Sequence, residues 1–156
     1  MSETAAAERR APHDARAVSR AQYGALVATV IIVGVVGAWS YFWPQPYFDH
    51  FPVFLGEWVS KDGPYNEHLV RDHGAMYLAL GAASLYGLVR PSQVGCLLLG
   101  IAWTAFGVLH FGYHVTHLHH LPTDEATGQV VVLAVAILLA VALMIPGRAR
   151  ERQEAR

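Results

Sequence analysis

The chain has 156 residues, and 54% of them are hydrophobic, whereas only 15% are charged and the formal net charge is −1. This composition is too apolar for an ordinary soluble domain, and the length suits one compact domain. The single cysteine, Cys96, excludes an internal disulfide bond.

Four stretches of the chain contain no charged residue: residues 26–43, 74–89, 94–109 and 130–145. Each is close to the length that crosses the hydrocarbon core of a bilayer, which is about 30 Å thick. We therefore expect four transmembrane helices. The first stretch is interpreted as a retained helix and not as a signal peptide, because a long polar segment precedes it and aromatic residues 41–43 follow it in place of a cleavage site.

The segment between the first and second expected helices is unusually aromatic for an aqueous loop. Pro44 and Pro46 end the first helix. The aromatic residues that follow are Tyr47, Phe48, Phe51, Phe54, Trp58 and Tyr65. Because rings of this kind favour an interface over bulk water, we expect this segment to lie at the membrane surface or to cover one mouth of the bundle.

The second expected helix combines a row of small residues with a polar beginning. The small residues recur at every fourth position: Ala75, Ala79, Ala83 and Gly87. Small residues at this spacing let two helix backbones approach closely. Continuing the row towards the start of the helix leads to Asp72 and His68. We therefore expect the packed face of this helix to carry these two residues at its outer end.

The third expected helix carries His110, His114 and His117, whose spacing places three imidazoles on one narrow stripe. The turn at residues 90–92 is so short that the second and third helices must be antiparallel neighbours. Asp72 and His110 are each about 18 residues from that turn, and at 1.5 Å of rise per residue they should lie at nearly equal height. The spacing thus predicts one site shared by both helices.

Imidazoles with one or two carboxylates are ligands that suit zinc or non-haem iron, and imidazole also suits copper. The predicted metal ligands are His68, Asp72, His110, His114 and His117, and the residues expected to support them or line the pocket are Asn66, Glu67, Arg71 and His73. A second alternative is haem held by one histidine from each helix, for example His73 and His110. A third is a proton-handling pocket without metal, and a fourth is a set of interface residues that binds nothing.

The basic residues indicate the orientation of the helices. Nine of the eleven lie at the two termini or in the turn at residues 90–92, and only Lys61 and Arg71 lie on the other side. The positive-inside rule therefore puts both termini in the cytoplasm and all histidines except His13 on the outer side of the plasma (inner) membrane. The N-terminal arginines are interpreted as topology signals, so no nucleic-acid partner is expected.

Two motifs resemble those of uncharacterised small four-helix integral membrane proteins of actinobacterial type. The first is GPYNEHLVRD at residues 63–72, and the second is His110-x-x-x-His114-x-x-His117-Leu118. The likeness covers about residues 55–120, and the architecture is also similar to that of DoxX-like four-helix proteins. The resemblance implies the topology and a shared outer site, and it implies no particular activity.

The sequence thus predicts an all-α, four-helix transmembrane bundle with an aromatic outer loop between the first and second helices. The expected parts are a disordered cytoplasmic tail at 1–22, the transmembrane domain at 23–147 and a second tail at 148–156. The leading functional hypothesis is a multi-pass membrane protein, an accessory subunit, that binds a metal ion or cofactor. The alternatives are a haem- or metal-dependent oxidoreductase component, and a structural protein that assembles as a homo-oligomer or in a larger complex.

Overall fold

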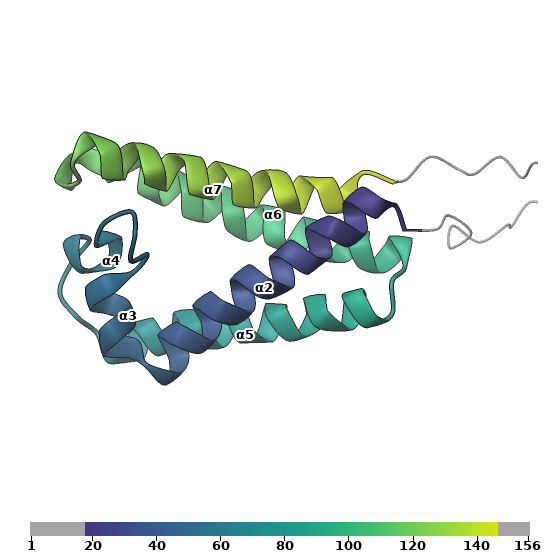
Figure 1. Cartoon of the computed structure of the whole chain (residues 1–156), viewed down its shortest axis with the longest axis horizontal. Helices are drawn as coiled ribbons and strands as arrows, with labels where there is room; N and C mark the ends of the chain where they lie inside the picture. The colour runs from purple at the N-terminus through teal and green to yellow at the C-terminus, as the bar shows by residue number, and fades with distance from the viewer. Residues whose placement is uncertain (1–17, 147–156) are drawn as a thin grey trace, which may run out of the picture.

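The computed structural model describes residues 18–146, and within this range the chain is mainly helical, with short non-helical segments between the helices (Figure 1). In chain order the helices are α2 (Arg20–Phe42), α3 (Pro44–His50), α4 (Trp58–Lys61), α5 (Glu67–Val89), α6 (Gln93–Thr116), the 3₁₀ turn η2 (Leu118–His120) and α7 (Thr123–Met144). The all-α prediction is confirmed. The predicted tails lie outside the described residues except for residues 18–22, where α2 already begins.

Side-chain caps explain where three of the long helices begin. Ser19 and Gln22 form a capping box at the start of α2, in which each side chain accepts a hydrogen bond from the backbone N–H of the other. Asn66 caps α5 and Ser92 caps α6, each by accepting a hydrogen bond from a backbone N–H three residues later. Since these caps satisfy N–H groups that would otherwise lack a partner, they fix the helix starts.

The long helices form two antiparallel pairs, α2 with α5 and α6 with α7, and α2 runs diagonally across the bundle to meet α7 at one end (Figure 1). At that end the buried side chain of Gln22 donates to the carbonyl of Leu143 at 2.9 Å and bonds to Gln93. We call this the arginine end, after Arg20 and Arg90. The opposite end carries α3, α4 and the histidines of α5 and α6, and we call it the histidine end.

Two glycines allow α2 and α5 to approach closely. A Cβ atom on Gly74 would lie 2.6 Å from the backbone nitrogen of Tyr41, and one on Gly37 would lie 2.9 Å from the Cβ of Tyr77. Both distances are too short for a side chain, so glycine is required at both positions. The bundle core continues from this contact towards the arginine end through the buried Leu26, Cys96, Leu99, Trp103 and Leu143.

The packed face of α5 differs from the predicted row of small residues. The buried residues of α5 are Val70, Gly74, Ser84 and Gly87, whereas Ala75, Ala79 and Ala83 are exposed in the single chain. A row with a strict spacing of four rotates by roughly 40° at each step, because an α-helix has 3.6 residues per turn. The row therefore leaves the packed face, and only its last member, Gly87, lies there.

Three of the four expected spans, α2, α6 and α7, are long and apolar enough to cross a membrane. Many large apolar side chains on these helices point outward, including Ile31, Val35, Leu98 and Leu138. This surface suits a lipid environment, in which apolar side chains are in contact with acyl chains. Among the described residues α5 does not reach the same apolarity, because its first two turns carry charged and imidazole side chains.

The aromatic segment folds into the short helices α3 and α4 at the histidine end (Figure 1). Its rings pack edge to face around Phe51, whose centroid lies 6.1 Å from that of Trp39 and 6.2 Å from that of the buried Trp58. An ion pair of 2.6 Å between Lys61 and Glu125 attaches α4 to α7. The segment therefore covers this end of the bundle, and residues 44–62 are called the cap below.

Candidate functional site

The histidines of α6 form a continuous stack of rings at the histidine end. His110 stacks on Phe106 with a centroid distance of 5.0 Å, and the ring of His114 meets that of His110 edge to face at 4.5 Å. His117 stacks on Tyr113 at 4.3 Å, and its Nδ1 lies 2.8 Å from the carbonyl oxygen of Tyr113. The predicted stripe is thus present for His110 and His114. His117 follows the last residue of α6, and its side chain contacts a backbone carbonyl of that helix instead of the other imidazoles.

His73 brings α5 into this site. Its ring lies 4.4 Å from that of Tyr77 and 5.7 Å from that of the buried Tyr47, and its Nδ1 is buried without a hydrogen-bond partner in the described part of the chain. The ring of Tyr77 in turn lies 5.5 Å from that of Phe106 on α6, and Phe106 stacks on His110. Burial raises the pKa of Tyr47, so its hydroxyl stays neutral beside these imidazoles.

Asp62 brings the cap into the same region. Its carboxylate lies 3.7 Å from His120 Nε2, with both side chains about one-quarter exposed, and it interacts electrostatically with Tyr113 and His114. The neighbouring ion pair between Lys61 and Glu125 holds this part of the cap against α7. The histidine end therefore places one carboxylate opposite the imidazoles of α6.

The other predicted residues at the start of α5 face away from this cluster. His68 and Asp72 are 3.3 Å apart on the exposed surface, with 86% and 63% of their side chains accessible. Arg71 pairs with Glu67 at 2.8 Å and also donates to the carbonyl of Tyr41. These groups stabilise one another and the junction with α2, and Asn66 acts as the cap of α5.

The five predicted metal ligands do not share one centre. Within residues 18–146, no three histidine, cysteine, aspartate or glutamate side chains converge closely enough to hold a metal ion. The donors that do approach one another are His110 and His114, with Asp62 and His73 nearby. The arrangement as it stands offers a pair of imidazoles with a carboxylate on the other side, which is a partial ligand set.

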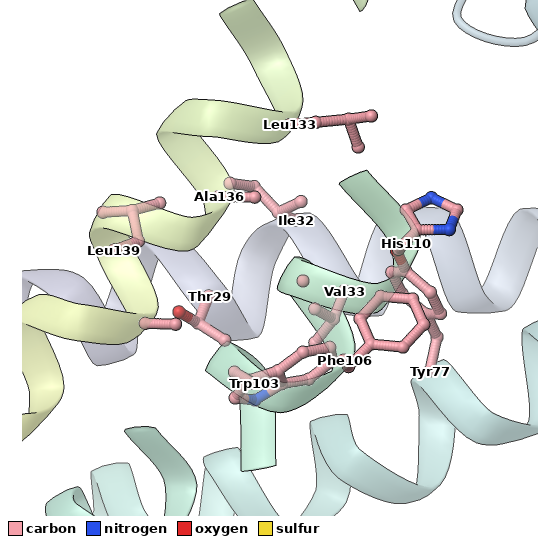
Figure 2. A pocket seen from close by; sticks show the side chains of 12 residues that line it. Thr29, Ile32, Val33, Tyr77, Trp103, Phe106, His110, Leu133, Ala136 and Leu139 are labelled. Atoms are coloured by element: carbon pink, nitrogen blue, oxygen red, sulfur yellow. The ribbon is translucent and has the colours of Figure 1, made fainter. Parts of the chain in front are cut away.

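A cavity of about 70 Å³ lies next to His110, between α2, α6 and α7 (Figure 2). The side chains that line it are apolar except for Thr29, Tyr77, Trp103 and His110. The indole N–H of Trp103 is already used, since it donates to Ser84 at 2.9 Å. The site therefore consists of two adjoining parts, the imidazole cluster at the histidine end and an apolar cavity beneath it.

Sequence reasoning missed several residues of this region. Asp62 stood in an Asp-Gly-Pro turn signal, and an acid in a segment expected to cover the histidines could have been considered as a partner for them. Thr29 and Tyr77 stood within apolar helices and carried no signal of their own. Their roles depend on how the helices are rotated about their axes, and one sequence does not specify these angles.

Comparisons with protein-family models, with curated proteins and with solved structures found no match to this chain.

Proposed function

We propose that this protein spans the membrane four times and binds a transition-metal ion at its histidine end. The observation that carries the proposal is the pair His110 and His114, whose rings lie 4.5 Å apart on successive turns of an apolar helix. Ionisable side chains inside a membrane-spanning helix are costly and mark functional positions. Asp62 from the cap adds a carboxylate that faces the pair from the opposite side.

The geometry of the helix ends supports a fourth span. The first turn of α2 bonds to Gln93 at the start of α6 and to Leu143 at the end of α7. Both α2 and α6 therefore begin at the arginine end and run in the same direction. The chain must cross back between them, and α5 is the segment that does so, over 23 residues packed along α2. If α2 and α6 span the membrane, α5 must span it as well.

The orientation follows from the charges. Arg20 and Arg90 lie at the arginine end, and most other basic residues of the chain are near the termini. We therefore propose that the arginine end faces the cytoplasm and the histidine end faces the outer side of the plasma membrane. A metal ion bound at that end would be exchanged with the outer aqueous phase, beneath the cap.

The ligand chemistry supports a metal ion of borderline softness. Two imidazoles at positions i and i+4 of a helix are a common pair of zinc ligands, and iron and copper also accept imidazole. Because His110 and His114 supply only two donors, a third must come from Asp62 or from His120. Both belong to segments outside the long helices, and metal binding requires one of these side chains to move towards the pair.

The test is elemental analysis of the protein purified in mild detergent without a histidine tag or chelator, combined with an absorption spectrum in oxidised and reduced form. We expect about one zinc, iron or copper ion per chain, as for a single specific site. His110→Ala and His114→Ala should each lower the affinity by more than about tenfold, because each removes one donor of a small set.

His68→Ala is the matched control, because His68 is exposed on the other side of α5. If His68→Ala loses the ion as the other two variants do, the site is the five-residue one predicted from the sequence and not the smaller one proposed here. If the wild-type protein binds none of the three metals, even after they are added back, the metal-site proposal is wrong.

Haem is the second candidate, and one observation favours it. His73 of α5 and His110 of α6 lie at the two ends of a series of ring contacts through Tyr77 and Phe106, and His73 Nδ1 is buried without a hydrogen-bond partner among the described residues. Two histidines from facing helices are a common way to hold haem in a membrane bundle. A Soret band that is lost in both His73→Ala and His110→Ala would establish this alternative, and the protein would then be an oxidoreductase component.

A further inference from the structure

The apolar cavity between α2, α6 and α7 contains a polar group that the imidazole site does not use. Thr29 of α2 lines this cavity, is only 7% exposed, and its hydroxyl makes no hydrogen bond to another described residue. Threonine in a helix can bond to the carbonyl four residues earlier, and Thr29 does not do so. A hydroxyl that lines an apolar cavity and has no described protein partner is available to bond to a molecule that enters the cavity.

The lining determines the charge of that ligand. Within residues 18–146, no aspartate, glutamate, lysine or arginine lines the cavity. An ionised headgroup would lose its hydration there without finding a counter-charge, and this excludes fatty acids in their ionised form and phospholipid headgroups. The oxygen that meets Thr29 therefore belongs to an uncharged group.

The size and shape of the cavity determine which part of a ligand it can hold. Its lining on α6 extends from Trp103 to His110, seven residues, which corresponds to roughly 10 Å along the helix axis. The volume of about 70 Å³ is only about half of the roughly 150 Å³ at which an apolar cavity accommodates benzene. The space is therefore too small for a ring such as benzene and holds only the oxygen-bearing end of a chain.

Access to the cavity is from the side of the bundle. Ala136 of α7 and Ile32 of α2 both line the cavity and are both exposed on the surface. Figure 2 shows Ile32 and Ala136 close to each other, with Thr29 on the side of Leu139 and His110 on the side of Leu133. This surface belongs to membrane-spanning helices, so a molecule that enters here comes from the bilayer.

We propose that this cavity binds the oxygen-bearing end of a neutral single-chain lipid, with Thr29 as its hydrogen-bond partner. The rest of the alkyl chain leaves the cavity between Ile32 and Ala136 and lies in the bilayer. A long-chain alcohol is the simplest molecule of this class. The proposal does not depend on a metal at the histidine end, because Thr29 and Ala136 belong to neither proposed ligand set.

The experiment uses the full chain reconstituted in phosphatidylcholine vesicles. The probe is dodecanol with a photoactivatable diazirine close to its hydroxyl, and the labelled positions are identified by mass spectrometry of the peptides. We expect labelling of α2 around Thr29 and of α6 near Trp103, and an excess of unlabelled dodecanol should suppress it. Labelling that is spread over the outward-facing apolar surface, and that unlabelled dodecanol does not displace, would overturn the proposal.

Matched variants locate the binding site. Ala136→Phe fills the opening and should reduce the specific labelling at least fivefold, whereas Ala105→Phe, at an exposed position of α6 outside the cavity, should leave it unchanged. Thr29→Val should weaken competition by dodecanol roughly threefold to tenfold, the range expected for one hydrogen bond, and Thr29→Ser should restore it. Equal labelling of the Ala136→Phe variant and the wild type would refute the cavity as the binding site. If that variant fails to fold, competition by unlabelled dodecanol on the wild-type chain decides whether the labelling is specific.

Discussion

The indole N–H of Trp103 donates a hydrogen bond of 2.9 Å to the hydroxyl of Ser84, and both residues are buried. This bond joins α6 to α5, two helices that are linked by a short turn but have few other close contacts. It also fixes the indole beneath Phe106 and Tyr77, whose rings lie 6.0 Å and 5.8 Å from it. The bond thus fixes the orientation of Trp103, the first ring in the series that leads through Phe106 to His110.

Ser84→Ala should therefore destabilise the bundle by about 1 kcal/mol, the magnitude of a hydrogen bond between membrane helices. The matched control is Ser40→Ala, because Ser40 is equally buried and also donates to the carbonyl four residues earlier, but accepts no bond from another of the described helices. Thermal unfolding in detergent measures both. Equal losses of stability in the two variants would show that the bond to Trp103 contributes nothing.

The contact between α2 and α5 predicts a strong effect at one glycine. Gly74→Ala places a methyl group 2.6 Å from the backbone of Tyr41, and the helices must separate to relieve the clash. Overpacking of this kind costs about 1 to 3 kcal/mol. Gly34→Ala is the control, because a Cβ atom there meets nothing within 4 Å and alanine is the better helix former. A Gly74→Ala protein as stable as the Gly34→Ala protein would contradict this close approach.

The sequence predicted the height of a residue along the bundle axis better than the direction in which its side chain points. Asp72 and His110 were expected at equal height, and His73, next to Asp72, is linked to His110 by ring contacts through Tyr77 and Phe106. Asp72 itself faces outward, because adjacent residues on a helix differ by roughly 100° in direction. Counting residues from the turn gives the height, since the rise per residue is constant. The direction depends on which side of α5 packs on α2, and this is decided by Gly37 and Gly74.

The long helices could be predicted from the sequence, whereas the arrangement of the site could not. Charge-free stretches marked the four long helices because hydrophobicity is a local signal, although each helix extends six or seven residues beyond its stretch at one end. The carboxylate nearest to the α6 histidines comes from Asp62, which is far from them in the sequence. Its position depends on the fold of the cap and on the ion pair between Lys61 and Glu125, and no local pattern encodes a contact over this separation.

That ion pair makes a prediction about the cap. Glu125→Gln should release α4 from α7 and increase hydrogen exchange and proteolysis in residues 51–66, since the pair is the main polar link between α4 and α7. Asp124→Asn, which removes the adjacent exposed acid, should have no such effect. The loss of stability should be below about 1 kcal/mol, as for most partly exposed ion pairs. Unchanged exchange in Glu125→Gln would mean that the packing of Trp58 alone holds the cap.

The arrangement of the helix ends makes the last prediction, which concerns topology. In a Cys96→Ala background, single cysteines are introduced at Gly63 and Asp124 at the histidine end and at Pro91 at the arginine end, all of which are exposed. If α5 spans the membrane, a membrane-impermeant maleimide added to intact cells should label Gly63→Cys and Asp124→Cys. It should label Pro91→Cys only after the membrane is permeabilised.

Each other outcome of this labelling has a distinct meaning. Labelling of Pro91→Cys together with Gly63→Cys would place both ends of α5 on one side, and the bundle would then have three spans. Labelling of Pro91→Cys alone would keep four spans but reverse the orientation inferred from the arginines. Because the first turn of α2 is bonded to α6 and α7 at the arginine end, the structure is compatible with three spans only if α2 leaves that contact.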